Sequence, residues 1–400
     1  MDLRNSIRCQ TDVALCIANH LLSQEKNIIF SPLSLYAALS IMAAGSEGRT
    51  LDQLLSFLQS DSIDHLNTFF SQLLSALLSS NVAAPSHHLY FVNGMWVDKS
   101  VSLSHFFKQL VASHYKATLA SVDFKTKGDQ VCREVNSWVE RETDGIITKL
   151  LPPKFDASIT ANHNFHLLNG TSVKVPYMMS NKSKQFISSF ADFKVLRLSF
   201  EQGTDKTHRF SMYIFLPGAK DGLPALIEKL ASKSSFLEDK YPLRKVQIRN
   251  FRIPKFKISY TFEASNVLKE LGVVSPFSKL DAEFTKITNS LMDELHVESM
   301  FHTTSIEVNE EGTEVTTASS VSWEVLGCDT CTDMDFVADH PFLFLIREDL
   351  TGAILFIGQV LHPLDGVTSS VKVSSSYMLM ERLYDRAKAD GLFGRMNAVE

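Results

Sequence analysis

The stretch Phe336-Val-Ala-Asp-His-Pro-Phe-Leu-Phe-Leu-Ile346 decides the fold of this 400-residue chain. Its second half, residues 342–346, is an unbroken apolar run, which is typical of a strand buried on both faces. A second apolar run follows at 354–360, after a polar connection at 347–352 that ends in glycine. Two such runs joined by a turn predict a buried hairpin.

The segment before this hairpin is unusually long. Residues 310–335 separate it from an apparent strand at 305–309, and they show poor periodicity. A connection of this length inside a compact domain is usually functional or disordered. Its first half nevertheless has good strand propensity, at Thr313, Val315, Thr316, Thr317 and Val321. A potential strand in such a place suggests two alternative states, while pattern alone leaves a flexible insertion equally open.

Helical periodicity dominates the first third of the chain, and strands are more frequent after it. Ser31-Pro32 supplies an N-cap and first turn for a helix that runs to Ala44, and Gly45 a stop signal. The pair Asn93-Gly94 interrupts an otherwise strand-like stretch. Helices and strands mix without βαβ regularity, and no linker or internal repeat divides the chain. The expected class is therefore α+β in one large domain.

Composition narrows the function classes. The net charge of −6 argues against a general nucleic-acid binder. The N-terminal residues lack the charged and apolar regions of a signal peptide, and no run of 18 apolar residues could span a membrane. Five scattered cysteines favour a reduced, intracellular protein. We therefore expect a cytoplasmic location and not an extracellular one. The matches to the glycosylation pattern at Asn169 and Asn181 are then expected to be chance matches.

Catalytic motifs are scarce: HExxH, Walker A, GxGxxG and GxSxG are all missing from the sequence. Cys328 and Cys331 form a CxxC pair without a second pair nearby, so incidental loop cysteines are favoured over structural zinc. A surface pair is the favoured interpretation of His87-His88, and a solvated face that of the aspartates at 329–339. We expect no enzyme, no metal and no cofactor.

With these residues in view, the chain resembles the serpin family, and within it the plant intracellular type, from the N-terminus to about Leu364. The stretch 336–346 fits the family signature at each position. The resemblance extends to Asn309-Glu-Glu-Gly-Thr-Glu314, Asn27-Ile-Ile-Phe-Ser-Pro-Leu-Ser34, Phe251-Arg-Ile-Pro-Lys-Phe-Lys257 and Phe356-Ile-Gly-Gln-Val360. It implies a serpin domain over residues 1–365, with helices around three β-sheets and an exposed reactive-centre loop at about 310–335.

The resemblance also implies a mechanism. A protease attacks the loop and forms an acyl-enzyme, and the cut loop then inserts into the central sheet as a new strand. The protease is dragged along and its active site is distorted. The uncut fold is a kinetic trap, so the inhibitor needs no catalytic group of its own. The implied partner is one target protease, with neither nucleic acid nor membrane, and the implied state is a monomer.

Residue roles follow from the resemblance one position at a time. The hinge of the loop corresponds to Glu310, Glu311, Gly312, Thr313 and Glu314, where the glycine lets the backbone swing. Family spacing puts the reactive bond at Leu326-Gly327, with Val325-Leu326 as the alternative. Leucine before the bond implies a chymotrypsin-like serine protease or a papain-like cysteine protease, and argues against trypsin-like enzymes. Ser31, Ser34 and His302 match the polar cluster that controls opening of the central sheet.

The chain departs from the family pattern in three places. Leu151-Pro-Pro-Lys-Phe-Asp156 skips a central-sheet strand beside the insertion slot, together with the Asn that would partner His302. The hinge continues as Val315-Thr-Thr317, where inhibitory members prefer smaller residues. Residues 366–400 extend past the usual end; a disordered tail is the favoured interpretation, and a short amphipathic helix at 378–388 the alternative.

Two function hypotheses remain. The first is a suicide-substrate inhibitor of a leucine-preferring protease. The second is a non-inhibitory serpin, whose loop is cut without trapping the protease because the strand after Pro153 is missing. An enzyme is the least favoured alternative.

Overall fold

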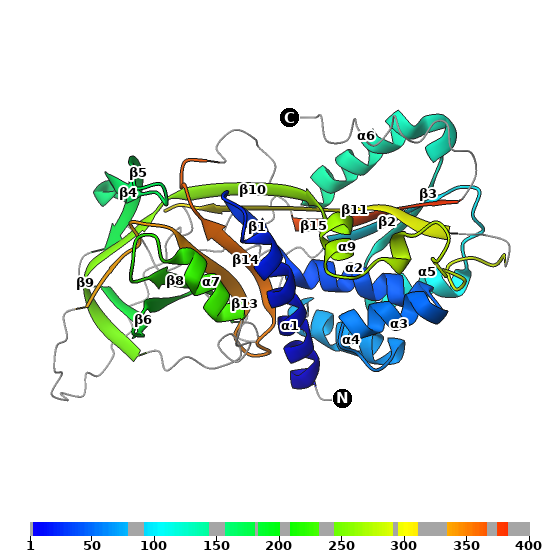
Figure 1. Cartoon of the computed structure of the whole chain (residues 1–400), viewed down its shortest axis with the longest axis horizontal. Helices are drawn as coiled ribbons and strands as arrows, with labels where there is room; N and C mark the ends of the chain where they lie inside the picture. Colours follow the sequence, from blue (N-terminus) through cyan, green and yellow to red (C-terminus); the bar gives the residue numbers. More distant parts are fainter. Residues whose placement is uncertain are drawn as a thin grey trace.

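The computed structural model describes residues 3–78, 92–143, 157–180, 183–200, 209–231, 244–290, 295–310, 334–365 and 374–382. These residues form two β-sheets and a set of helices, which confirms the α+β class. The described strands make two sheets and not the three that the family resemblance implied. Figure 1 shows the larger sheet toward one end of the long axis and helices α2–α5 toward the other.

The helices of the described chain lie mostly in its first half. The α-helices are α1 Leu3–Leu21, α2 Pro32–Gly45, α3 Gly48–Phe57, α4 Ile63–Leu78, α5 His105–His114, α6 Phe124–Thr143, α7 Leu223–Ala231 and α9 Ala264–Glu270; the short 3-10 helices are η1 Ala157–Ile159 and η2 Ser275–Phe277. None of these helices is both long and apolar enough to cross a membrane.

The smaller sheet has five strands in the order β10-β11-β15-β2-β3. Their bounds are β10 Phe256–Glu263, β11 Leu295–Val308, β15 Ser374–Arg382, β2 Val92–Asp98 and β3 Thr118–Val122. We call this five-stranded sheet the central sheet; it contains β11, the longest of the described strands.

The larger sheet has the order β1-β14-β13-β8-β7-β6-β9-β5-β4, with β12 paired to β9. The strands are β1 Ile28–Phe30, β4 Ala161–His166, β5 Ser172–Ser180, β6 Ser183–Ser189, β7 Phe193–Ser199, β8 Phe210–Pro217, β9 Arg244–Pro254, β12 Met334–Val337, β13 Phe342–Glu348 and β14 Ile354–Val360.

The buried hairpin predicted from the two apolar runs is confirmed as β13 and β14. The strands pair antiparallel, with Leu345 opposite Ile357 and Ile346 opposite Phe356. β1 adds to the free side of β14, and β8 to the free side of β13. Both hairpin strands are therefore interior strands, which explains their unbroken apolar sequence.

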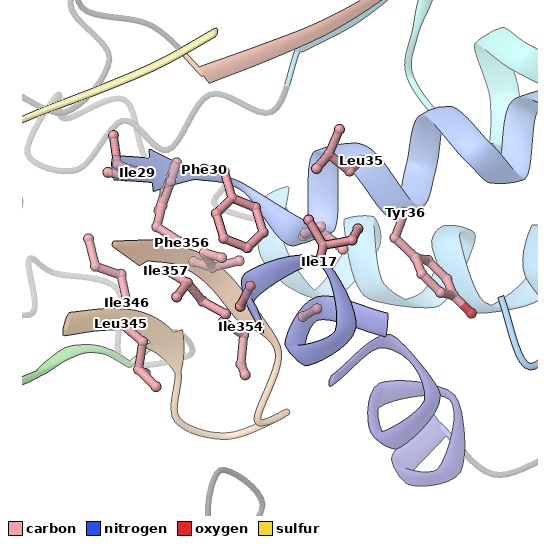
Figure 2. Packing of buried hydrophobic residues seen from close by; sticks show 14 of the residues in the cluster. Ile17, Ile29, Phe30, Leu35, Tyr36, Leu345, Ile346, Ile354, Phe356 and Ile357 are labelled. Carbon is pink, nitrogen blue, oxygen red and sulfur yellow. The ribbon is translucent and has the colours of Figure 1, made fainter. Parts of the chain in front are cut away.

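One large apolar cluster joins the hairpin to the first two helices. Figure 2 shows Ile17 of α1 and Phe30 of β1 near Ile354, Phe356 and Ile357 of the hairpin. Every residue of α2 is buried, which fits a helix that is apolar all round. The predicted start of α2 is confirmed, because the Ser31 hydroxyl caps it by accepting the Ser34 N–H at 3.3 Å.

Two features of the central sheet differ from the sequence expectation. The stretch through Asn93-Gly94 continues as one strand, β2. Position 94 requires glycine for packing and not for a turn, because a Cβ atom there would lie 2.4 Å from the Trp96 ring. Within the expected disordered tail, Ser374–Arg382 forms strand β15, which pairs on both sides. The sheet gives this segment hydrogen-bonding partners that its own sequence pattern does not reveal. Residues 366–373 and 383–400 lie outside the described part of the chain.

The hairpin offers a test of how far this core supports the fold. Leu345 is 3% exposed, whereas Leu350, in the turn of the same hairpin, is 60% exposed. We expect Leu345→Ala to destabilise the protein by about 3 kcal/mol through lost burial and a cavity. Leu350→Ala, the matched control, is expected to change stability by less than about 0.5 kcal/mol. Thermal unfolding followed by circular dichroism measures both, and equal effects would contradict this placement of the core.

Candidate functional site: loop anchors and the central-sheet slot

The segment identified as the reactive loop connects the two sheets. It leaves the central sheet where β11 ends at Val308, and it enters the larger sheet where β12 begins at Met334. The expected reactive bond, Leu326-Gly327, lies outside the described residues, as do four of the expected hinge residues, Glu311, Gly312, Thr313 and Glu314. What the structure does describe is how each end of the loop is held.

Glu310, the first hinge residue, is fixed at the N-terminal end of the loop. Its carboxylate forms an ion pair with the Lys255 ammonium at 2.6 Å and accepts a hydrogen bond from the Thr160 hydroxyl at 2.5 Å. Burial opposes ionisation of this carboxyl, but the bonds from Lys255 and Thr160 outweigh it and lower the pKa of Glu310. The ion pair and the hydrogen bond therefore hold Glu310, the last described residue before the loop, in one position.

The C-terminal end of the loop is fixed by β12. Phe336 is fully buried and stands in register with Phe251 of β9, with the two ring centroids 6.3 Å apart. The Asp335 carboxylate accepts the Asn250 N–H at 3.1 Å, and its carbonyl accepts a hydrogen bond from Lys194 at 2.9 Å. The N-terminal end of the loop is therefore held by side chains between β9 and β10 and before β4, and the C-terminal end by strand pairing with β9.

The central sheet contains the place where an inserted loop would pair. We call the space between β11 and β2 the slot. In this structure β15 fills the slot, antiparallel to β11 and parallel to β2. The strand that family resemblance expects at the centre of the sheet has no counterpart among its five described strands. The slot is therefore present, but its occupant comes from the C-terminal extension.

The three residues expected to form the polar cluster do come together beneath the slot. The Ser31 backbone N–H donates to His302 Nε2 at 2.9 Å. Ser34 lies one helical turn away and donates its hydroxyl to Asn93 Oδ1 at 2.9 Å. The cluster therefore ties the start of α2 to β11 on one side of the slot and to β2 on the other.

Two members of this cluster were missed by the sequence analysis. Thr304 Oγ1 lies 2.8 Å from His302 Nε2, and Asn93 receives the hydroxyl of Ser34. The analysis interpreted Asn93 as part of a strand break and expected His302 to have lost its Asn. Strand alternation is the signal that could have found it: Asn93 lies on the same face of β2 as the buried Met95 and Val97.

His302 is completely buried, and burial lowers the pKa of its imidazole to about 3. The Ser31 N–H requires an unprotonated Nε2 as its acceptor, so the network assigns the neutral ring with its proton on Nδ1. Protonation would place a positive charge on a nitrogen that already faces a donor. The cluster is thus built for a neutral histidine.

The other face of the slot is covered by α6. An apolar cluster joins Trp96 of β2, Phe301 of β11 and Trp138 of α6. The two indole rings meet edge to face, with centroids 4.8 Å apart. Since α2 contacts β15 from the polar side and α6 contacts it from the apolar side, the slot lies within the protein and not at its surface.

Among the described residues, no group of three or more His, Cys, Asp or Glu side chains is arranged to hold a metal ion. Cys328 and Cys331 lie outside this part of the chain.

The buried histidine predicts a specific pH dependence. Because its pKa is lower folded than unfolded, stability is present above the unfolded pKa of about 6.5 and is lost as the pH falls toward 3. We expect this residue alone to cost about 2 kcal/mol between pH 6.5 and pH 5. His302→Gln should remove that slope, whereas His105→Gln, at an exposed position, should leave it. Unfolding measured at both pH values checks this; a slope unchanged in His302→Gln would contradict it.

Comparison with known proteins agrees with this geometry. The family profile Serpin (serine protease inhibitor) matches residues 8–363. Serpin-ZX of Arabidopsis thaliana is 45% identical over 392 residues, covering 91% of this chain and 100% of that protein. Serpin-ZXA of Oryza sativa subsp. japonica is also 45% identical, over 395 residues, covering 91% of this chain and 98% of its own.

Solved structures give the same assignment. The native stressed conformation of AtSerpin1 from Arabidopsis superposes with a TM-score of 0.82 at 44% identity, covering 91% of this chain and 99% of that one. A cleaved serpin, Serpin 42Da, superposes with a TM-score of 0.72 at 27% identity, covering 89% and 98%. The loop held between two sheets, the polar cluster beneath the slot and these matches lead to one conclusion: the chain belongs to the serpin family, as a relative of the plant Serpin-Z protease inhibitors.

Proposed function

We propose that this serpin presents residues 310–335 as bait for a protease that cuts after leucine, with Leu326-Gly327 as the reactive bond. The proposed targets are chymotrypsin-like serine proteases and papain-like cysteine proteases. The observation that carries the proposal is the pair of anchors. Glu310 is held by Lys255 and Thr160 just after β11, and Phe336 pairs with β9, so a cut between them leaves each loop fragment anchored at its base.

The first hypothesis is suicide-substrate inhibition, in which the cut loop enters the slot and traps the acyl-enzyme. It is supported by the family assignment and by the polar cluster that links both sides of the slot to α2. A monomeric state and a cytoplasmic location stay predictions.

Exchange of the residue before the reactive bond tests the specificity. A chymotrypsin-like pocket is apolar and a trypsin-like pocket holds an acid, so we expect Leu326→Arg to transfer cleavage from chymotrypsin to trypsin, each rate changing by on the order of 100-fold. Leu350→Arg, at an exposed leucine outside the loop, is the matched control and should keep the wild-type preference. Mass spectrometry of the fragments identifies the bond; cleavage of the wild type at a site other than 326–327 would contradict the assignment.

A second hypothesis is favoured by one specific observation. Because β15 already pairs with both β11 and β2, the cut loop finds no vacant place between them. The full-length protein would then behave as a substrate, being clipped without trapping the protease. This is the non-inhibitory alternative that the missing strand suggested.

The two hypotheses differ in one gel. A trap forms only if the loop inserts before the acyl-enzyme is hydrolysed. Because β15 occupies the slot, we expect the protein mixed with chymotrypsin or papain to give only a clipped product. A covalent band at the summed mass of both proteins on a denaturing gel would establish the inhibitory hypothesis instead. Catalytically inactivated protease serves as the control for non-covalent association.

A further inference from the structure

We propose that β15 and the reactive loop compete for one place in the central sheet, and that the C-terminal extension holds the slot and keeps the cut loop out. The proposal rests on the proposed function for the identity of the competitor, whereas the position of β15 does not depend on it. Figure 1 shows β15 lying along β11, far in sequence from every other strand of the sheet.

Strand polarity is the first argument. A loop that leaves β11 at Val308 and folds back into the sheet must run antiparallel to β11. β15 runs antiparallel to β11 as well, and parallel to β2 on its other side. The two segments would use the same N–H and C=O groups of the same two neighbours. They cannot occupy the slot together.

The length of the pairing is the second argument. β15 pairs with β11 from Leu295 to Thr304, and its described part begins at Ser374 opposite Thr304. Residues 305–308 of β11 have β10 as their one strand neighbour among the described residues. The buried Ser305 hydroxyl there has no hydrogen-bond partner. Within the described residues, the pairing of β15 with β11 therefore ends at Thr304, four residues before β11 itself ends at Val308.

The polar cluster is the third argument. Ser376 of β15 stands in register with His302 on one side and with Asn93 on the other. It belongs to the run Ser374-Ser-Ser376, and the reactive loop carries a similar run of small, mostly hydroxylated residues, Thr316-Thr-Ala-Ser-Ser320. Small residues suit a strand that crosses a tightly packed cluster. The tail therefore resembles the loop in the part that must pass this point.

Chain connectivity decides which competitor prevails. A cut at 326–327 leaves the tail on the fragment that contains β12, β13 and β14, which stays within the larger sheet. The tail is therefore already paired when the loop is released. To pair with both β11 and β2, the loop must displace β15 from them, and each pair it gains costs one pair of the β15 ladder.

Amide hydrogen exchange on the full-length protein tests occupancy before and after cleavage. We expect peptides covering 374–382 to exchange about 100-fold more slowly than an unstructured peptide in the uncut protein, and to stay protected after the loop is cut. Absence of protection before the cut would overturn the position of β15. Loss of protection after the cut would overturn its ability to keep the loop out.

A proline variant tests the competition. Leu379 pairs with Ser299 on one side and Trp96 on the other, so Leu379→Pro removes a ladder N–H from the middle of β15. Lys388→Pro, in the same extension but outside β15, is the matched control. After loop cleavage we expect the melting temperature of Leu379→Pro to rise by on the order of 10 °C, as the loop fills the slot, and that of Lys388→Pro and the wild type to change little.

Equal changes in Leu379→Pro and Lys388→Pro would overturn the competition. If Leu379→Pro does not fold, hydrogen exchange on the unaltered chain decides. Any bond cut within 311–333, mapped by mass spectrometry, serves both measurements. Failure of the proposed target or bond therefore shows in the cleavage map, and failure of the competition shows in the exchange and melting data.

Discussion

Every N–H and C=O group of a buried strand needs a hydrogen-bonding partner, and β11 is the strand for which this requirement shapes the molecule. β10 satisfies one side of it along its second half. The other side faces the slot, where β15 is the one described strand between β11 and β2. Leaving this side unpaired would expose a long row of backbone groups within the protein, between α2 and α6. The C-terminal extension supplies the missing partner, so a segment outside the usual domain completes the sheet.

The polar cluster connects the central sheet to helix α2, which packs on it. His302 and Thr304 belong to β11, Ser31 and Ser34 to the start of α2, and Asn93 to β2. Separation of β11 from β2 would therefore also disturb the N-terminal cap of a fully buried helix. Since α2 packs on β14 of the larger sheet as well, the opening of one sheet is coupled to the core of the whole molecule.

Sequence reasoning predicted those parts of the fold that local pattern determines. The β13–β14 hairpin follows from two apolar runs, and the start of α2 from Ser31-Pro32. The cluster residues Ser31, Ser34 and His302 came from family resemblance, since nothing in their own neighbourhood marks them as partners. Local pattern failed at β2, where Asn93-Gly94 has the composition of a turn but the glycine is needed beneath two tryptophan rings.

The tail strand could not be predicted for a related reason. Its first residues, Ser374-Ser-Ser376, have weak strand propensity, and its partners lie about 75 and 280 positions away in sequence. A strand whose stability comes entirely from such distant neighbours leaves no periodic signal of its own. The segment at 310–335 is the converse case: its sequence has strand propensity, although in chain order it connects two strands, β11 and β12, of different sheets.

The tether that carries β15 has a consequence for how copies of this protein behave toward one another. A vacant slot would present two inner strand edges, which is a template for a strand from another molecule. Because residues 366–373 join β15 to the end of the larger sheet, its local concentration at the slot is in the millimolar range. A loop from a second copy at micromolar concentration is outcompeted by about a thousandfold. On the proposal that β15 holds the slot, the C-terminal extension would thereby disfavour strand exchange between copies and the self-association that follows from it.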